Sequence, residues 1–480
     1  MRVSLVTQHC VSAFIPLALL YLKASLVERG RCPQDTVDVV EFDRDASSST
    51  VVSRILETEP DVVGFSCYVW NVTTLMAAAR EMKARRPQTR IVFGGPEVGP
   101  VADAVLRRHP SIDVIVKSEG EIPLVEMQQA WAARRDLSNV KGICYRRGEE
   151  IVDTGEAPLL KDIDELPSPH LHRYGDVGKR VICVETQRGC VFRCNFCFYN
   201  KDFSLRNRRF ELDRVKQELR YWLDQDVLEI YLMDPVFNLN PARTKEICRF
   251  IAEHNHRRTR LHAEIWAEFV DDEMAQLMRD ANFQFLEVGL QTTDTTALAT
   301  VERRLKLQKF VDGVGHLKEH GLPFELQLIY GLPGETRASF ARSLNFAISL
   351  DPSDLEVFPL MVLPGTELAR NAAALKLTFD PEPPYYARSH RSMTTEDFDY
   401  GRRLIAACTH LQKSRTVRLL AKERGLSFSA ILDEWIQWQD REGTDTTDRE
   451  AITRFVSELC AARTIPAGFY DRFARLEWGA

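Results

Sequence analysis

The sequence predicts two successive α/β units followed by a helical region: a doubly wound parallel sheet, then a six-unit barrel or partial barrel. Twice along the chain, short runs rich in Val and Ile alternate with helical patterns, which is typical of parallel strands connected by covering helices. Between the two series the periodicity is lost, and Pro167 and Pro169 indicate a linker.

These patterns divide the chain into residues 1–155 (first α/β domain), 156–180 (linker), 181–370 (barrel) and 371–480 (a mainly helical region). Strands expected in the first domain are Val3–Val6, Val37–Phe42, Asp61–Cys67, Ile91–Phe93 and Val114–Val116. Strands expected in the barrel are Val181–Thr186, Leu228–Met233, Leu261–Trp266, Phe285–Leu290, Phe324–Ile329 and Leu355–Leu360. The prolines before Tyr385 favour a domain joint, with an approach of this segment to the active site as the alternative. The helical tail, with Trp435, Trp438 and Trp478, is expected to cover the barrel mouth.

Composition excludes several classes of protein. With 44% apolar residues, 28% charged residues and a net charge of -6, the chain resembles an ordinary globular protein and offers no basic surface for nucleic acid. The longest apolar stretch, Phe14 to Leu22, is less than half of what a membrane-spanning helix needs, and no secretory signal is visible. We therefore expect a cytoplasmic protein without a membrane or nucleic-acid partner.

Three cysteines lie close together directly after the first barrel strand, in the segment RGCVFRCNFC (188–197). Cys190, Cys194 and Cys197 can converge on one iron–sulfur cluster from a single loop. With 11 cysteines in 480 residues, this spacing arises by chance in about 0.6% of shuffled chains. Three ligands on a four-iron cluster leave one iron open. Zinc is the alternative, but a closed zinc site needs four ligands and no nearby pair completes this one.

The cysteine segment resembles the cluster loop of the radical SAM superfamily, including the aromatic Phe196 before the last cysteine. In that family the open iron binds S-adenosylmethionine (SAM), which is cleaved to a 5′-deoxyadenosyl radical. Residues 231–234 (YLMD), 287–291 (EVGLQ) and 327–336 (QLIYGLPGET) resemble further segments of the family in the right order. The resemblance implies that Phe196, Asp234, Gln291 and Gln327 contact SAM, although the family's usual Gly-Gly-Glu is absent at Asp234. For Gln291 and Gln327, a polar residue that merely closes a strand is an equal alternative.

The first domain resembles the Rossmann-like cobalamin-binding domain of cobalamin-dependent radical SAM enzymes. The resemblance rests on residues 16–22, 63–66 (VGFS), 94–97 (GGPE) and 118–121 (SEGE). In open sheets ligands bind beyond the carboxyl ends of strands, where these loops lie. The resemblance implies a cobalamin site formed by Ser66, Cys67, Tyr68, Trp70, Gly94, Gly95, Pro96, Glu97, Glu119 and Gly120.

The lower face of cobalt is where the sequence departs from part of this family. The Asp-x-His-x-x-Gly motif that supplies a cobalt ligand is missing, and around His9 the chain reads TQHCVS (7–12). His9 is more simply a surface or core histidine. Trp70 is the candidate to pack below the metal, with a plain core position as the equal alternative.

The function implied is a cobalamin-dependent radical SAM methyltransferase that methylates an unactivated carbon of a small-molecule or natural-product substrate. Its cofactors would be a [4Fe-4S] cluster, SAM and methylcobalamin, with flavodoxin or ferredoxin as electron donor. One alternative keeps the cofactors but catalyses a rearrangement or cyclisation. Another is an iron–sulfur redox or regulatory protein. The sequence does not identify the substrate, because specificity depends on the pocket.

Overall fold

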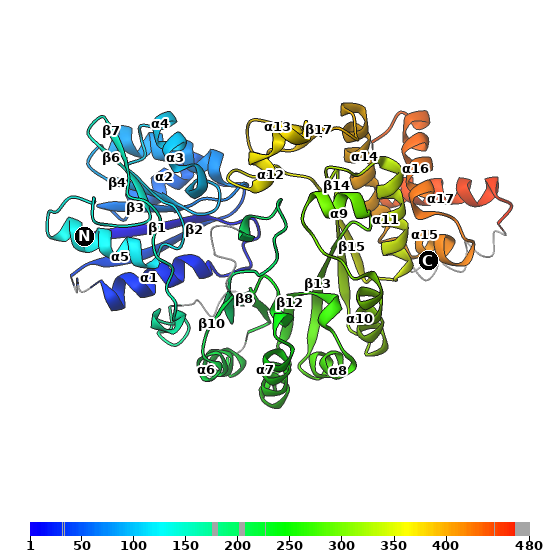
Figure 1. Cartoon of the computed structure of the whole chain (residues 1–480), viewed down its shortest axis with the longest axis horizontal. Coiled ribbons are helices and arrows are strands. Elements are labelled where there is room, and N and C mark those ends of the chain that lie inside the picture. Colours follow the sequence, from blue (N-terminus) through cyan, green and yellow to red (C-terminus); the bar gives the residue numbers. More distant parts are fainter. Residues whose placement is uncertain are drawn as a thin grey trace.

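The computed structural model describes residues 1–30, 32, 34–174, 181–200, 207–225, 227–445 and 447–465. An N-terminal α/β domain, a second parallel sheet and a group of C-terminal helices follow one another along the chain and across the molecule (Figure 1). Among the described residues, no helix combines the length and the apolar character that crossing a membrane requires.

The N-terminal sheet has the strand order β2-β1-β3-β4-β5-β6-β7. The five expected strands are confirmed and run parallel: β1 (Arg2–Gln8), β2 (Thr36–Phe42), β3 (Val62–Ser66), β4 (Arg90–Gly94) and β5 (Val114–Val116). An antiparallel hairpin, β6 (Ile143–Arg147) and β7 (Glu150–Asp153), extends the sheet and was not foreseen.

Helices cover both faces of this sheet, as doubly wound folds require. One face carries α1 (Leu17–Arg29) and α5 (Glu121–Ala132), and the other carries α2 (Ser48–Leu56), α3 (Val72–Arg85) and α4 (Ala102–Arg108). The chain reverses its winding direction at β1 and β3, so the carboxyl ends of these two strands form a crevice.

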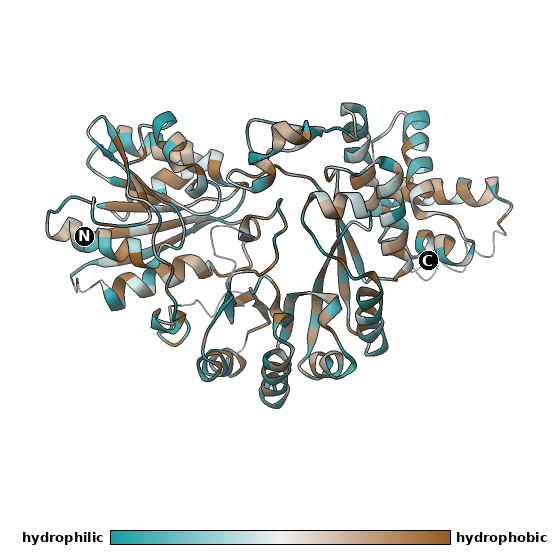
Figure 2. Ribbon diagram, viewed as in Figure 1, coloured by the Kyte–Doolittle hydropathy of each residue, from teal (hydrophilic) through white to brown (hydrophobic). Residues whose placement is uncertain are grey.

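The second sheet contains the six expected strands in the order β15-β14-β13-β12-β11-β8, all parallel to their neighbours. They are β8 (Val181–Val184), β11 (Glu229–Leu232), β12 (Arg260–Ile265), β13 (Phe283–Gln291), β14 (Phe324–Tyr330) and β15 (Asp354–Pro359). The connecting helices are α6 (Leu212–Leu223), α7 (Pro241–His254), α8 (Asp272–Asp280), α9 (Thr295–Thr300), α10 (Leu307–Glu319) and α11 (Arg337–Ser349). The sheet curves but its first and last strands do not pair, which makes it a partial barrel with apolar strands inside (Figure 2).

Each outer edge of the partial barrel is covered by another part of the chain. At the β8 edge, the amide of Ile15 donates to the carbonyl of Val181 (3.2 Å), and the amide of Val181 donates to that of Ala13 (3.1 Å). At the opposite edge, α14 (Thr395–Leu411) packs along β15. The N-terminal domain is therefore joined to the barrel by backbone hydrogen bonds.

The described C-terminal helices pack beside β15 and α11 rather than across the barrel mouth, so for these helices the expectation is wrong. After α12 (Glu367–Arg370), α13 (Ala372–Leu375), β16 (Thr378–Phe379) and β17 (Ala387–Ser389), α14 packs against β15 and α16 (Phe428–Glu442) against α11 (Figure 1). The remaining helices are α15 (Arg415–Glu423) and α17 (Arg449–Ala462). Trp435 and Trp438 stack in this helical core, with ring centroids 5.2 Å apart, so burial of their rings determines the packing. Trp478 lies outside the described residues.

Candidate active site

The cysteine loop lies beyond the carboxyl end of β8, between the short strand β9 (Gln187–Arg188) and the 3-10 turn Phe198–Asn200. Backbone contacts hold it from two sides. The amide of Asn195 donates to the carbonyl of Val301 (3.1 Å), and the carbonyl of Asn195 accepts from the amide of Leu368 (2.9 Å). The barrel thus presents Cys190, Cys194 and Cys197 on a supported loop, where active sites of such barrels are assembled.

The three thiols are close enough to affect one another electrostatically. Burial raises the pKa of Cys190, and it raises that of Cys197 to about 12, with both other thiols contributing. They do not form a trio of ligand atoms within 4.8 Å. Three thiols on one short loop suit a four-iron cluster, which takes its ligands from closely spaced cysteines.

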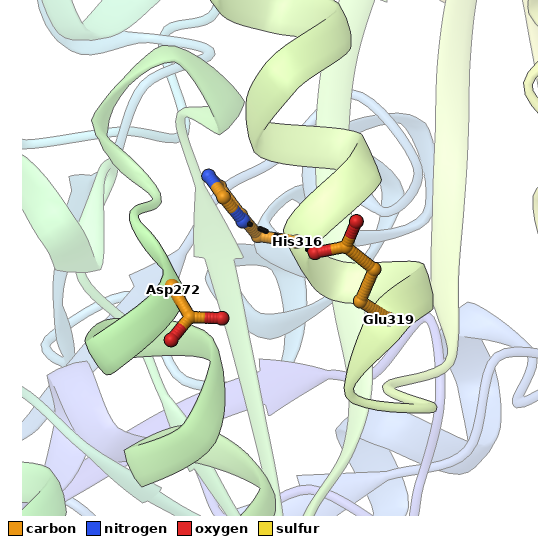
Figure 3. Close-up of side chains that lie close together, drawn as sticks. All are labelled: Asp272, His316 and Glu319. Atoms are coloured by element: carbon orange, nitrogen blue, oxygen red, sulfur yellow. Dashed lines mark ion pairs between the residues drawn. The ribbon is translucent and has the colours of Figure 1, made fainter.

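Within the described part of the chain, one trio of metal-ligating side chains does lie within 4.8 Å: Asp272, His316 and Glu319 (Figure 3). It is on the outer surface between α8 and α10. Surface ion pairs account for it, because His316 lies 3.5 Å from Glu319 and Asp272 lies 2.8 Å from His320. We assign no metal there.

Arg303 lies beside the cluster loop and was missed by the sequence reasoning. Its Nη1 is 3.7 Å from the Sγ of Cys194, and its Nη2 donates to the carbonyl of Gly289. Next to it, Gln291 ends β13 with φ +67°, and its buried Oε1 has no hydrogen-bond partner. A cation and an orphaned polar atom beside the cysteines fit an amino-acid ligand such as SAM. No motif distinguishes Arg303 from its charged neighbours in the sequence.

Asp234 is buried at the end of β11, where its carboxylate binds the chain that leads into the cluster loop. Oδ1 accepts from the amides of Thr186 (2.7 Å) and Gln187 (3.1 Å). Burial raises its pKa to about 7. These bonds give Asp234 a structural task, and its contact with SAM stays a prediction.

Polar side chains of four adjacent strands face one another inside the barrel. Nε2 of Gln327 donates to Glu287 and to Glu325 (3.0 Å each), and the hydroxyl of Tyr231 donates to Glu287 (2.9 Å). Burial raises the pKa of Glu264 to about 8, and the carboxylate of Glu287 adds to the effect. Tyr231 and Glu287 lie in segments that resemble the family but were given no role, and Glu264 and Glu325 were not foreseen, because only the curvature of the barrel brings these side chains together.

Phe196 is the remaining expected SAM contact, and Gly331 is a glycine of a segment that resembles the family. Phe196 is partly buried against the barrel core. Gly331, in the QLIYGLPGET segment, has φ +90°, and a Cβ there would lie 2.5 Å from the ring of Phe398. The absence of a side chain at Gly331 therefore allows Phe398 of α14 to pack against this turn.

A cavity of about 610 Å³ extends from the strand ends of the N-terminal domain to the barrel. The barrel contributes Cys183, Arg188, Tyr231, Met233 and Glu287, among others. Eight of the ten residues predicted to bind cobalamin line it: Ser66, Tyr68, Trp70, Gly94, Gly95, Pro96, Glu119 and Gly120. None of the predicted cluster or SAM residues lines this cavity; on the barrel side its lining includes Gly189, directly before Cys190, and Met233, directly before Asp234.

Cys67 and Glu97, the two other predicted cobalamin residues, do not line this cavity. The Cys67 side chain is fully buried. Glu97 is 5% exposed and accepts a hydrogen bond from the hydroxyl of Tyr385, in the proline-rich segment that was expected to be a domain joint. Successive side chains of an extended segment point to opposite sides, so Cys67 can point away from the cavity that Ser66 and Tyr68 line.

Trp70 and His9 differ in what they present to the cavity. The Trp70 ring stacks on Tyr68, with centroids 4.4 Å apart and planes 4° from parallel, and is 42% exposed, so it is not a plain core residue. Its Nε1 donates to the carbonyl of Gln8 (3.0 Å). His9 lies 2.7 Å from Glu41. Gly94 leaves open space at the cavity, because the nearest atom to a Cβ placed there would be the Cβ of Val116 at 3.8 Å.

Fold and site together define an iron–sulfur enzyme built on a partial barrel, with a nucleotide-type cofactor cradle in an adjoining doubly wound domain. Residues 3–128 match the family model of the B12 binding domain, and residues 184–347 match that of the radical SAM superfamily. The chain belongs to the cobalamin-dependent radical SAM enzymes, and its cofactors are a [4Fe-4S] cluster, SAM and cobalamin.

Three curated relatives match between 65% and 75% of this chain. An uncharacterized methyltransferase of Pyrococcus horikoshii is 27% identical over 75% of this chain and 79% of the relative. The cobalamin-dependent radical SAM methyltransferase TokK of Streptomyces tokunonensis is 29% identical over 65% of this chain, but the match spans 48% of TokK. An anaerobic magnesium-protoporphyrin IX monomethyl ester cyclase of Synechocystis is 25% identical over 73% of this chain and 70% of the relative.

A solved structure shows the same fold. The cobalamin-dependent SAM radical enzyme OxsB, with aqua-cobalamin and SAM bound, superposes with a TM-score of 0.67 at 15% identity. The superposition covers 97% of this chain and 75% of OxsB. It therefore extends into the C-terminal helices, beyond both family models.

Proposed function

We propose that this enzyme methylates an unactivated carbon of a small-molecule substrate. One observation carries the proposal: a single cavity is lined both by the strand-end loops of the B12 binding domain and by barrel residues next to the cluster loop. A substrate carbon in that cavity can lie between the two cofactors. The methyltransferases among the relatives support the same reaction.

When bound, the cluster and SAM supply a radical that removes a hydrogen atom from substrate, and cobalamin supplies the methyl group. The chain's own residues bind and orient these cofactors. Cys190, Cys194 and Cys197 would hold the cluster, and the Arg303 guanidinium would pair with the carboxylate of SAM. Trp70, in the wall of the cavity, would help to hold cobalamin and shield it from water.

The polar groups predicted from the sequence have complementary tasks. The free Oε1 of Gln291 is suited to a ribose hydroxyl of SAM. The Nε2 of Gln327 already donates to Glu287 and Glu325, so Gln327 would offer its amide oxygen to the ribose. Phe196, beside Cys197, would pack against the same ligand, and Asp234 would fix the approach to the cluster loop. An external electron donor such as flavodoxin or ferredoxin would reduce the cluster.

The test is anaerobic purification, cluster reconstitution with hydroxocobalamin, and product analysis with candidate substrates. We expect about four iron atoms and one cobalt per chain, and both 5′-deoxyadenosine and S-adenosylhomocysteine during turnover. Cys194→Ala should abolish 5′-deoxyadenosine formation. A Cys194→Ala protein that still formed it would contradict the assignment of the cluster.

A ring-forming reaction is the second candidate, because one relative is a cyclase. The two functions differ in one product. Turnover that yields 5′-deoxyadenosine without S-adenosylhomocysteine, and a substrate product without added mass of a methyl group, would favour cyclisation or rearrangement. A protein that binds the cofactors but cleaves no SAM would instead have a redox or regulatory task.

A further inference from the structure

The arginine directly before the cluster loop is held by acidic side chains of the other domain. Arg188 is the last residue of β9, two positions before Cys190. Its Nη1 lies 2.6 Å from Oε1 of Glu121 and 3.8 Å from Oε2 of Glu119. Glu119 lies in the turn between β5 and α5 of the N-terminal domain, and Glu121 is the first residue of α5, so the contact crosses between domains.

The same guanidinium also contacts the barrel. Its Nε lies 2.8 Å from Oε2 of Glu185, which directly follows β8. The guanidinium of Arg188 lies over the ring of Tyr21 from α1, 4.9 Å from the centroid. Its donors therefore have partners on both sides of the domain junction, and the planar fork suits two carboxylates at once.

A second arginine strengthens the junction from the other end of the loop. β10 (Arg208–Arg209) pairs antiparallel with β9, placing Arg208 opposite Arg188. Nη1 of Arg208 donates to Oε2 of Glu119 (3.0 Å) and to the carbonyl of Leu160 (3.1 Å), and its Nη2 donates to the other oxygen of Glu119. The two strands that flank the cluster loop thus share one acidic turn.

These charges are largely removed from solvent. The side chains of Arg188, Arg208, Glu119 and Glu121 are each between 8% and 12% exposed. A buried charge that loses its partner is costly, so the arrangement tolerates one geometry and resists displacement. Arg188, Glu119 and Glu121 also line the cavity. The ion pairs therefore lie in the wall of the cavity, and their arginine stands two residues before Cys190.

We propose that Arg188 is a positioning residue, through which the turn Glu119–Glu121 holds the cluster loop and each cofactor strengthens binding of the other. The inference rests on the cofactors of the proposed function. If bound cobalamin orders the turn, the guanidinium of Arg188 transmits that order to the cluster loop. Binding is reciprocal, so a cluster in the loop must raise the affinity for cobalamin by the same factor by which cobalamin raises the affinity for the cluster.

The test compares hydroxocobalamin affinity of the full-length chain with and without a reconstituted cluster, under anaerobic conditions. In the unmodified protein we expect affinity to rise about fivefold or more on cluster loading. Arg188→Lys keeps the positive charge but loses the planar guanidinium that can bind two carboxylates. In this variant we expect the ratio of cobalamin affinities with and without the cluster to fall to about one. The matched control is Arg209→Lys, since Arg209 is exposed and its Nε donates to Asn207 within the same segment; its ratio should equal that of the unmodified protein.

A second variant protects the test against misfolding of the first. Glu121→Gln removes the acidic partner from the other domain while leaving the cluster loop intact, and should give the same loss of coupling. Combining it with Arg188→Lys should add nothing, because both changes break one contact. An unchanged ratio in Arg188→Lys and Glu121→Gln would overturn the proposal. If the unmodified protein binds both cofactors with a ratio of one, this inference fails alone; if it binds neither, the proposed function fails as well.

Discussion

At the scale of single residues, the cluster cysteines could be predicted from the sequence, whereas Arg303 beside them could not. Cys190, Cys194 and Cys197 were predicted from their spacing, since one short loop must supply all three ligands. Arg303 reaches Cys194 from a segment 109 positions later in the chain. No local pattern records such a contact, because the fold alone brings the two segments together.

Arg303 yields a direct prediction. In Arg303→Lys the charge remains but the fork is lost, and a charge-assisted contact of about 1.5–3 kcal/mol is weakened. We expect the KM for SAM to rise roughly tenfold or more, with iron content unchanged. The adjacent, exposed Arg304 provides the control, and Arg304→Lys should leave the KM unaltered. Equal values for both variants would show that Arg303 does not bind SAM.

At the scale of elements, all eleven strands expected from hydrophobic runs are present, and their ends differ by few residues. Parallel strands buried on both faces give continuous apolar runs, which are easily recognised. The β6–β7 hairpin was missed because its strands are short and mix apolar with charged residues. The C-terminal helices were recognised, but their amphipathic pattern does not say which surface they cover.

The β4 turn shows how one element shapes the cradle. Gly95 has φ +103°, and a Cβ there would lie 2.5 Å from the backbone oxygen of Cys67. Gly95→Ala should therefore separate the β3 and β4 loops, reduce stability by about 1–3 kcal/mol and weaken cobalamin binding. The measurements are denaturant unfolding and a cobalamin titration.

Gly148, in the β6–β7 hairpin, is the matched control for this prediction. It also has a positive φ (+63°), but a Cβ there would meet no atom within 4 Å. Gly148→Ala should lower the free energy of unfolding by about 1 kcal/mol through backbone strain, without steric crowding, and should leave cobalamin affinity unchanged. Similar cobalamin affinities in the Gly95→Ala and Gly148→Ala proteins would refute the role of crowding at the cradle.

At the scale of the whole molecule, the region after the barrel returns to the N-terminal domain. The hydroxyl of Tyr385 donates to the carboxyl of Glu97, and Arg108 pairs with Glu382 (2.8 Å). The proline-rich segment therefore serves as a joint between the two ends of the fold. The sequence indicated a joint but not its partner, since contacts between distant segments leave no periodic signal.

This joint predicts a pH dependence. Burial raises the pKa of Glu97 to about 7, above its usual value near 4.5, so the folded protein binds this proton more tightly than the unfolded chain. The contribution of Glu97 to stability must fall as pH rises from about 4.5 to about 7, and stay low above that. Glu97→Gln should be more stable than the unmodified protein at pH 8, by roughly 1–3 kcal/mol, and nearly equal to it at pH 5.

Unfolding by denaturant at both pH values checks this prediction. Glu382→Gln is the control, because Glu382 lies in the same segment but its side chain is 64% exposed. Its effect should be small at either pH. A Glu97→Gln advantage of the same size at pH 5 and pH 8 would mean that ionisation of Glu97 does not weaken the joint.

Covering both edges of the partial barrel has a consequence for handling the protein. Residues 13–15 hydrogen-bond to the β8 edge, and α14 packs along the β15 edge. A barrel expressed without its flanking regions would expose two edge strands with unpaired backbone groups. Exposed edge strands can pair with those of other copies and so promote aggregation. Truncated versions intended for crystallisation or cofactor loading should therefore retain both flanks, or they will precipitate before they can be studied.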